Sequence, residues 1–151
     1  MTNTGAFLRA LPIVGGCIAN PAAGQQAVFG EWRVTGSMCP TECAISQREA
    51  ESWRGRIATY DDTLARFDAH RCARPRYTVG YWPASGVYGG ARLQDLGISG
   101  DSAMVVDVQC PTRPQEGPDP RWQEPGGFLI VKDRNHLLMV WEGVFFELTR
   151  R

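Results

Sequence analysis

The chain has 151 residues, 43% of them hydrophobic, and its sixteen basic and sixteen acidic residues give no net charge. This length and composition suit one domain built around one hydrophobic core. A neutral chain without clustered positive charge lacks the electrostatic signature of nucleic-acid-binding proteins, so we expect no nucleic-acid partner.

The first 29 residues contain one charge, Arg9, which precedes an apolar run of ten residues and a stretch of small residues that ends at Gly24. This layout is typical of a secretory leader. We therefore expect residues 1–24 to be a signal peptide and residues 25–151 to form the mature domain. The apolar run is about half as long as a membrane-spanning helix, so we expect no transmembrane segment.

Val14-Gly15-Gly16-Cys17 offers a second outcome, because it resembles the lipobox of bacterial lipoproteins, in which the cysteine is acylated. The alternative, which we favour, is that Cys17 is an ordinary residue of a discarded leader, since only seven residues separate it from Arg9. Both outcomes predict a periplasmic or secreted protein, and the lipobox adds a lipid anchor at Cys17.

Polar and apolar side chains alternate in eight short segments, as in half-buried strands. These segments are residues 30–38, 56–60, 63–67, 76–82, 102–110, 128–132, 136–142 and 144–149. After the first segment, Ser46 and Glu49 have the spacing of a capping box and predict a short helix that ends at Gly55. We expect one helical turn at residues 91–96, and a loop at residues 110–126, which contain five prolines.

A small chain with this many strands protects its sheet edges best by closing the sheet. We therefore expect a mostly β fold, a single closed antiparallel β-barrel of about eight strands, with one or two short helices. Such a barrel has room for side chains or one small ligand. An open sandwich of two sheets is the alternative fold.

Four cysteines follow the leader: Cys39, Cys43, Cys72 and Cys110. An even number in an exported chain is typical of two disulfides, for which three pairings are possible. We favour Cys72–Cys110, between two strand ends, and Cys39–Cys43 within one loop. The alternative is a zinc site, but only one close cysteine pair is present, and we expect no bound metal.

Gly30-Glu31-Trp32 opens the first predicted strand, and an arginine, Arg150 or Arg151, follows the last one. With these residues the chain resembles the lipocalin-like (calycin-like) small barrels. In lipocalins a G-x-W tryptophan closes one end of the barrel and a late arginine packs across it. The resemblance implies that Trp32 and Arg150 take these positions. The chain departs from lipocalins in its predicted helix after the first strand and in lacking a long C-terminal helix.

Residues 96–101, 129–133 and 136–148 are similar to segments of a group of small exported bacterial proteins. This similarity covers nearly the whole mature domain. It supports the expected fold and location, and it implies no biochemical activity.

Aromatic side chains from several strands are expected to point into the barrel: Trp32, Tyr60, Tyr77, Tyr81, Trp141 and Phe146. Such walls suit a small hydrophobic or aromatic ligand, and they would equally form a filled core. We therefore expect a ligand-binding protein without catalysis or cofactor. The alternative is an envelope protein-binding module, such as a hydrolase inhibitor, that uses the loop with Trp122 and the loop with Val87 and Tyr88.

Few residues are candidates for catalysis. His70, in an expected loop, and His136, beside an expected turn, are typical of solvated histidines. Asp107 and Glu142 are candidates for the acid–base pair of a barrel-type lyase or cyclase. Alternation places both carboxylates on the outer, solvated face of the barrel, so we do not favour this function.

Three arginines form a local cationic group: Arg66, Arg74 and Arg76. Such a group would suit an anionic headgroup or a carboxylate. The alternative, which we favour, is ordinary surface pairing with neighbouring acids. These acids are Asp61, Asp62 and Asp68.

Overall fold

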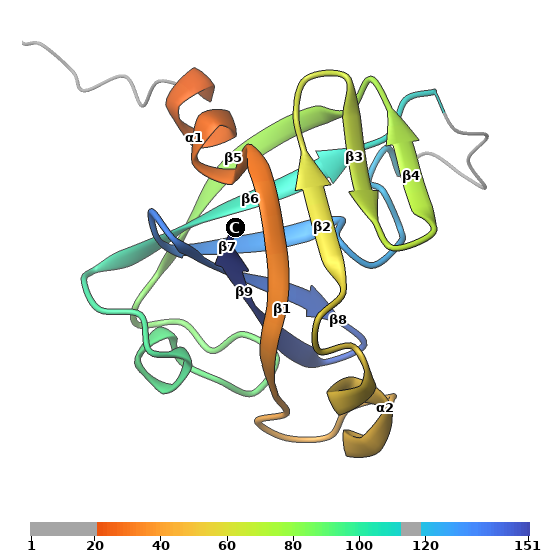
Figure 1. Cartoon of the computed structure of the whole chain (residues 1–151). Helices are drawn as coiled ribbons and strands as arrows, with labels where there is room; N and C mark the ends of the chain where they lie inside the picture. The colour runs from red at the N-terminus through yellow and green to blue at the C-terminus, as the bar shows by residue number, and fades with distance from the viewer. Residues whose placement is uncertain (1–20, 113–118) are drawn as a thin grey trace, which may run out of the picture.

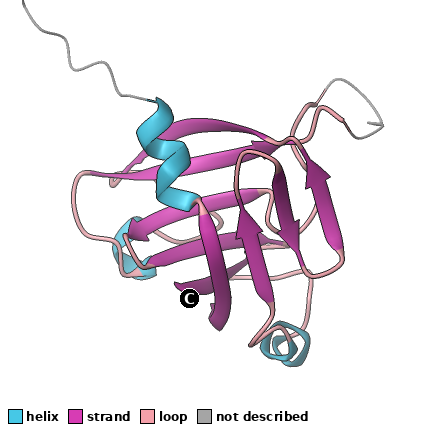
Figure 2. Ribbon diagram, turned by 45° about the horizontal axis from the view of Figure 1, so that its top comes forward, coloured by secondary structure: helices cyan, strands magenta, loops and turns pink. Residues whose placement is uncertain are grey.

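The computed structural model describes residues 21–112 and 119–151, and nine antiparallel strands in these residues form one sheet. The sheet curls into an open half-barrel (Figures 1 and 2). Its strands are β1 (Gly30–Met38), β2 (Ile57–Tyr60), β3 (Leu64–Phe67), β4 (His70–Ala73), β5 (Arg76–Pro83), β6 (Ser102–Gln109), β7 (Phe128–Asp133), β8 (His136–Trp141) and β9 (Val144–Arg150). The helical elements are α1 (Pro21–Val28), α2 (Gln47–Ser52) and the 3-10 turn η1 (Leu93–Leu96).

The prediction of a closed barrel of about eight strands is wrong, because the sheet has a ninth strand and its two ends do not pair. The strand order is β4-β3-β2-β1-β9-β8-β7-β6-β5, so β4 and β5 are consecutive in the chain but lie at opposite ends of the sheet. Two residues separate them. Arg74 has a positive φ of 50°, and Pro75 has no backbone N–H to donate, so the chain turns a corner here instead of forming a hairpin.

Contacts other than a β-ladder bridge the two ends of the sheet. Cys72 of β4 forms a disulfide with Cys110, which directly follows β6. Next to this disulfide, the Thr112 hydroxyl donates a hydrogen bond to the Ala73 carbonyl at 2.7 Å. The disulfide therefore ties the edge strand β4 to the end of β6, which is the neighbour of the other edge strand, β5.

The inner face of the half-barrel encloses the main hydrophobic core. Its largest buried side chains include Trp32, Tyr60, Phe67, Leu129, Leu137, Met139 and Phe146. The helix α2 begins as predicted, with the Ser46 hydroxyl accepting a hydrogen bond from the Glu49 N–H at 3.1 Å. Trp53, at the end of α2, stacks on Phe146 with ring centroids 4.6 Å apart, so α2 contributes to the same core.

A second, smaller core lies on the outer face of the sheet. The segment 84–101, which includes the predicted helical turn as η1, covers the outer side of β6–β9. The buried residues of this core are Ala91, Leu93, Leu96, Ile98, Ala103, Val105, Ile130, Leu138 and Phe145. Strand β6 is therefore buried on both faces, since Val106 and Val108 face the main core.

The helix α1 packs across one end of the half-barrel (Figure 1). Gly24 is buried in this contact, and a Cβ atom at this position would lie 2.5 Å from Cγ2 of Val79. The expected leader boundary after Gly24 falls inside α1. The candidate lipobox and Cys17 lie outside the described residues.

Candidate functional site

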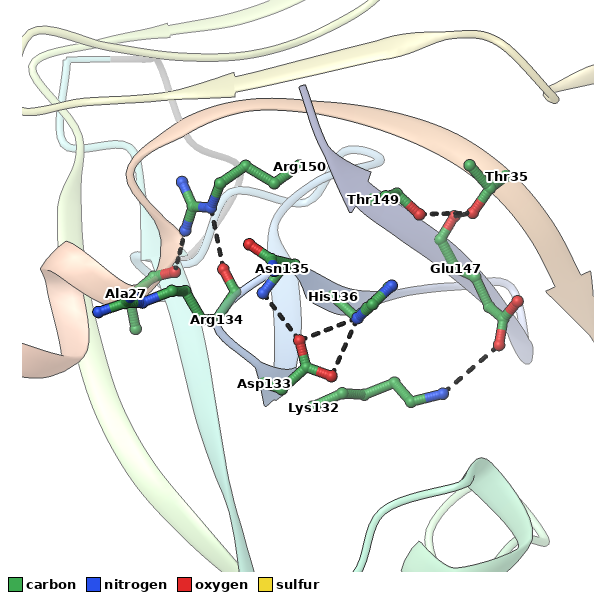
Figure 3. Close-up of polar contacts among 10 residues, drawn as sticks. All are labelled: Ala27, Thr35, Lys132, Asp133, Arg134, Asn135, His136, Glu147, Thr149 and Arg150. Carbon is green, nitrogen blue, oxygen red and sulfur yellow. Dashed lines mark hydrogen bonds and ion pairs between the residues drawn. The ribbon is translucent and has the colours of Figure 1, made fainter.

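The residues of the lipocalin resemblance meet at the end of the half-barrel that α1 covers. Trp32 and Arg150 are direct neighbours across β1 and β9, and the guanidinium carbon lies 4.1 Å from the ring centroid. The fully buried Trp32 donates its indole N–H to the Val28 carbonyl at 2.8 Å. Arg150 donates to the Phe29 carbonyl at 2.7 Å. It also donates to the Ala27 carbonyl at 3.2 Å (Figure 3). These contacts hold the end of α1 in place, which is a structural role.

Most of the six aromatic side chains proposed as ligand-binding residues lie in the packed interior. Trp32 and Phe146 are 0% exposed, Tyr60 is 1% exposed and Tyr77 is 8% exposed. The Tyr60 hydroxyl donates to the Gly126 carbonyl at 3.0 Å. The Tyr77 hydroxyl donates to a backbone carbonyl of the β2–β3 turn at 2.7 Å. Both hydroxyls are therefore engaged within the fold, and burial raises the pKa of each tyrosine above its ordinary value.

Only two of the six aromatic residues reach solvent. Tyr81, near the end of β5, is 52% exposed, and Trp141, at the end of β8, is half-buried. Trp141 lines a surface pocket, which is described below. Of the six predicted ligand-binding residues, Trp141 therefore lines a candidate site.

A wide polar concavity lies on the outer face of β1, β9 and β8, in two adjoining pockets of about 700 and 460 Å³. Most of its charged side chains pair with one another (Figure 3). The pairs are Glu31 with Arg151, Lys132 with Glu147 at 3.5 Å and Asp133 with His136 at 2.9 Å. The residues that line this surface are mostly charged or polar, and their mutual pairing leaves little charge for a ligand.

A smaller pocket of about 290 Å³ combines apolar walls with a carboxylate, and we call it the Asp107 pocket. Strand β6 supplies Asp107, β7 supplies its direct cross-strand neighbour Phe128, and β8 supplies Val140 and Trp141. The loop between β6 and β7 forms the remaining wall. The loop residues that line the pocket are Arg121, Trp122, Gln123, Glu124 and Gly127.

Backbone hydrogen bonds fix this loop against β6. The Trp122 N–H donates to the Val108 carbonyl at 2.7 Å, and the Val108 N–H donates to the Gly127 carbonyl at 2.8 Å. The Trp122 side chain is 3% exposed and packs in the main core. The loop that forms this pocket wall is therefore anchored to β6 and to the main core.

Asp107 is half-buried, and burial raises the pKa of its carboxyl above the ordinary value. Arg121 opposes this shift and Asp119 adds to it. The Arg121 guanidinium is itself held by Asp119, with its Nε 2.9 and 3.0 Å from the two carboxylate oxygens. Among the described residues, none donates a hydrogen bond to Asp107, and the charge of the nearby Arg121 is shared with Asp119.

The other carboxylates have different surroundings. Glu124, which also lines the pocket, forms an ion pair with His70, whose Nδ1 lies 2.8 Å from the carboxylate. Glu142 is exposed in the β8–β9 turn with a positive φ of 51°, and it does not line the pocket. The structure therefore does not bring Asp107 and Glu142 together as an acid–base pair.

Sequence reasoning placed two of these residues incorrectly. His70 begins β4, although a loop was predicted, because its strand is short and lacks an apolar alternation. Asp107 lies on the outer face as predicted, but it is not fully solvated. The signal for its burial is the proline-rich segment after β6, whose described residues 119–127 lie back along the strand, and sequence alternation does not report such a cover.

The cysteines lie in the expected pairs, with Cα atoms 6.1 Å apart for Cys39–Cys43 and 5.6 Å apart for Cys72–Cys110. Two such pairs suggest an oxidising, extracytoplasmic environment. Within residues 21–112 and 119–151, no group of three or more His, Cys, Asp or Glu residues is placed to hold a metal ion. The helices of these two ranges are all too short or too polar to span a membrane.

Comparison of the chain with protein families, with curated proteins and with solved structures finds no match. The relation to lipocalins therefore stays a prediction. The functional argument rests on the geometry of the Asp107 pocket.

Proposed function

We propose that this protein is an exported binding protein that holds a small ligand in the Asp107 pocket. The ligand has an aromatic or aliphatic body and a cationic group, as in a small primary amine. The observation that carries this proposal is the half-buried Asp107 carboxylate beside the apolar side chains of Phe128, Val140 and Trp141.

The charges of the pocket favour a cation. Arg121 is matched by Asp119, and Glu124 is matched by His70 when the histidine is protonated. Asp107 is the remaining charge, and its partial desolvation makes a hydrogen-bonded cation favourable. The aromatic walls add to this preference, because a cation is attracted to the face of an aromatic ring.

The pocket supports binding without chemical conversion. General acid–base catalysis requires groups within hydrogen-bond reach of the reacting atoms, in complementary protonation states. Among the described residues, Asp107 has no second unpaired carboxylate beside it, since Glu124 is tied to His70 and Glu142 lies outside the pocket. Export is supported by the predicted leader and by the two cysteine pairs.

Three ligands of similar size test the proposal: phenethylamine, phenethyl alcohol and phenylacetate. They share one aromatic ring and differ in the charge of the polar group. Titration calorimetry should show the amine binding about tenfold more tightly than the alcohol, because a hydrogen bond to a charged group is stronger than one between neutral groups. The carboxylate should bind least, and equal binding of the amine and the alcohol would contradict the proposal.

Asp107→Asn is the matched variant, because it removes the charge and retains the shape. It should reduce binding of the amine to the level of the alcohol. Glu142→Gln removes the same charge outside the pocket and should leave the affinity unchanged. Since burial raises the pKa of Asp107, affinity for the amine should fall on acidification at a pH above the ordinary value of a carboxyl group.

A protein partner is the second candidate, and the loop after β5 favours it. Val87 is 60% exposed, and with Tyr81 it is one of the two large hydrophobic side chains that the described residues expose. The neighbouring Tyr88 stacks on Trp82 with ring centroids 3.9 Å apart, which holds the loop in place. A photo-crosslinking residue at position 87 should capture one envelope protein, and Asp107→Asn should leave that capture unchanged.

A further inference from the structure

Two arginines are direct neighbours on the outer face of the sheet, at the end opposite to β5. Arg66 of β3 pairs with Arg71 of β4 in the antiparallel register, and Thr59 of β2 pairs with Arg66 on its other side. Directly opposed residues of antiparallel strands have Cβ atoms about 5 Å apart. The two guanidinium groups are therefore in reach of a single small ligand.

Two of the three acids near these arginines in the sequence are engaged elsewhere. The Asp61 carboxylate accepts hydrogen bonds from Thr63 and from the Leu64 N–H within the β2–β3 turn. Asp68 forms an ion pair with Arg56 at 3.4 Å. The favoured pairing of these acids with the predicted arginine group is therefore not what the structure shows.

Acids elsewhere on this face do not neutralise the arginine pair either. Thr59 pairs with Glu31 on β1, and Glu31 forms an ion pair with Arg151. Within the described part of the chain, no carboxylate forms an ion pair with Arg66 or Arg71. Among the described residues, the two positive charges therefore face each other without compensation.

This arrangement has an energetic cost that a ligand would remove. Like charges directly opposite one another destabilise a sheet. In addition, the Nε atom of Arg66 is buried and has no hydrogen-bond partner in the structure. Buried donors are nearly always satisfied in native proteins, so the orphaned Nε–H leaves this guanidinium group under-satisfied beside a second guanidinium group.

We propose that Arg66 and Arg71 form a binding site for a doubly charged tetrahedral oxyanion, which is a phosphate monoester or a sulfate group. Two charges on the anion match the two guanidinium groups, and arginine binds such groups through paired N–H donors. The Thr59 hydroxyl adds a donor on the far side of Arg66. This site is separate from the Asp107 pocket and does not depend on the function proposed for that pocket.

Inorganic phosphate and phosphatidic acid present the same chemistry in free and membrane-bound form, so both are tested with the full disulfide-bonded chain. Phosphate is titrated against chloride at constant ionic strength, while the Nε–H resonance of Arg66 is followed by NMR. In a parallel arm, vesicles of phosphatidylcholine with and without phosphatidic acid are sedimented with the protein. A shift of the Arg66 resonance by phosphate, or sedimentation only with phosphatidic acid, would support the site and identify the source of the anion.

Arg66→Gln and Arg71→Gln should each weaken this binding about tenfold or more, because each removes charged hydrogen bonds. Arg48→Gln is the matched control, since Arg48 is an exposed arginine on α2 and should not affect binding. Circular dichroism verifies that the variants fold.

Three results would overturn the proposal. One is the absence of any response in both arms, and another is an equal response from all three variants. The third is self-association of Arg71→Gln with unchanged phosphate binding. That result would show that the charge of Arg71 serves only to keep the edge strand β4 from pairing with another chain.

Discussion

The guanidinium group of Arg150 lies on the ring of Trp32, with its central carbon 4.1 Å from the ring centroid, at the point where β1, β9 and α1 meet. Arg150 also donates hydrogen bonds to backbone carbonyls at the end of α1. One side chain thus joins the first strand, the last strand and the helix that covers the end of the half-barrel. The geometry explains why an arginine near the end of the chain contributes to its fold.

Replacing Arg150 with Met should lower the free energy of unfolding by about 2–4 kcal/mol, because it removes the cation–π contact and leaves several carbonyls without a donor. Arg150→Lys should recover little of the loss, since an ammonium group cannot reach the same carbonyls from above the ring. Urea unfolding followed by tryptophan fluorescence measures both changes.

Arg151→Met is the control for this experiment. Arg151 forms a surface ion pair with Glu31, and such a pair contributes about 1 kcal/mol or less. Equal losses for the variants at positions 150 and 151 would mean that the contact with Trp32 does not stabilise the fold.

The two disulfides should differ in their effect on stability. Replacing both Cys72 and Cys110 with Ala should lower the free energy of unfolding by about 4 kcal/mol, since this disulfide closes a loop of 38 residues. The same change at Cys39 and Cys43 should have an effect of about 2 kcal/mol, because only four residues separate them. Urea unfolding of the two double variants tests this order, and the reverse order would show that restraint of the open sheet edges matters little.

Alkaline pH should destabilise the protein through its buried tyrosines. Burial raises the pKa of Tyr60 and of Tyr77 above the ordinary value near 10. The unfolded chain therefore loses these protons at a lower pH than the native protein does. The contribution of this pKa difference to the free energy of unfolding is fully present below pH 10 and decreases as the pH rises above it.

Tyr60→Phe isolates this effect. At neutral pH it should lower the free energy of unfolding by about 1–2 kcal/mol, because the Gly126 carbonyl loses its donor. Above pH 10 the free energy of unfolding should fall less steeply with pH in the variant than in the natural protein, by about 1.4 kcal/mol per pH unit. Denaturant unfolding between about pH 9 and pH 11 measures how steeply the free energy of unfolding falls with pH in the two proteins. Identical slopes would contradict the raised pKa of Tyr60.

The packing of α1 on β5 predicts that Gly24 tolerates no side chain. Gly24→Ala should lower stability by about 1–2 kcal/mol, because the new Cβ would lie 2.5 Å from Cγ2 of Val79. Combining it with Val79→Ala should relieve the overlap, so the loss in the double variant should be smaller than the sum of the two single losses. Additive losses would show that α1 does not rest on β5 at this point.

Sequence alternation predicted all strands except β4, because each of the other eight carries at least two apolar side chains at alternate positions. The sequence of β4, His70-Arg-Cys-Ala73, has a single buried apolar position, so it shows no alternation. The capping box of α2 and the turn η1 were also predictable, since both depend on neighbouring residues. The helix α1 was not, because its residues also fit the end of a leader.

The candidate site was predictable only in its parts. Asp107 and Trp141 were both recognised as candidates, but for different functions and on different faces of the sheet. They line one pocket because Trp141 ends its strand and because the loop containing Trp122 folds back along β6. The pair of Arg66 and Arg71 was missed in the same way, since register across β3 and β4 brings together residues that no local pattern connects.

The amino-acid sequence by itself determined which residues form most of the strands and which face of most strands is buried, because these properties follow from neighbouring side chains. Only the tertiary structure decided which of the three possible cysteine pairings forms, that the sheet stays open, that a disulfide ties β4 to the end of β6 and that the interior is filled with aromatic side chains. These outcomes depend on how distant strands curl and pack against one another. A local stretch of sequence does not show which of these long-range contacts will form.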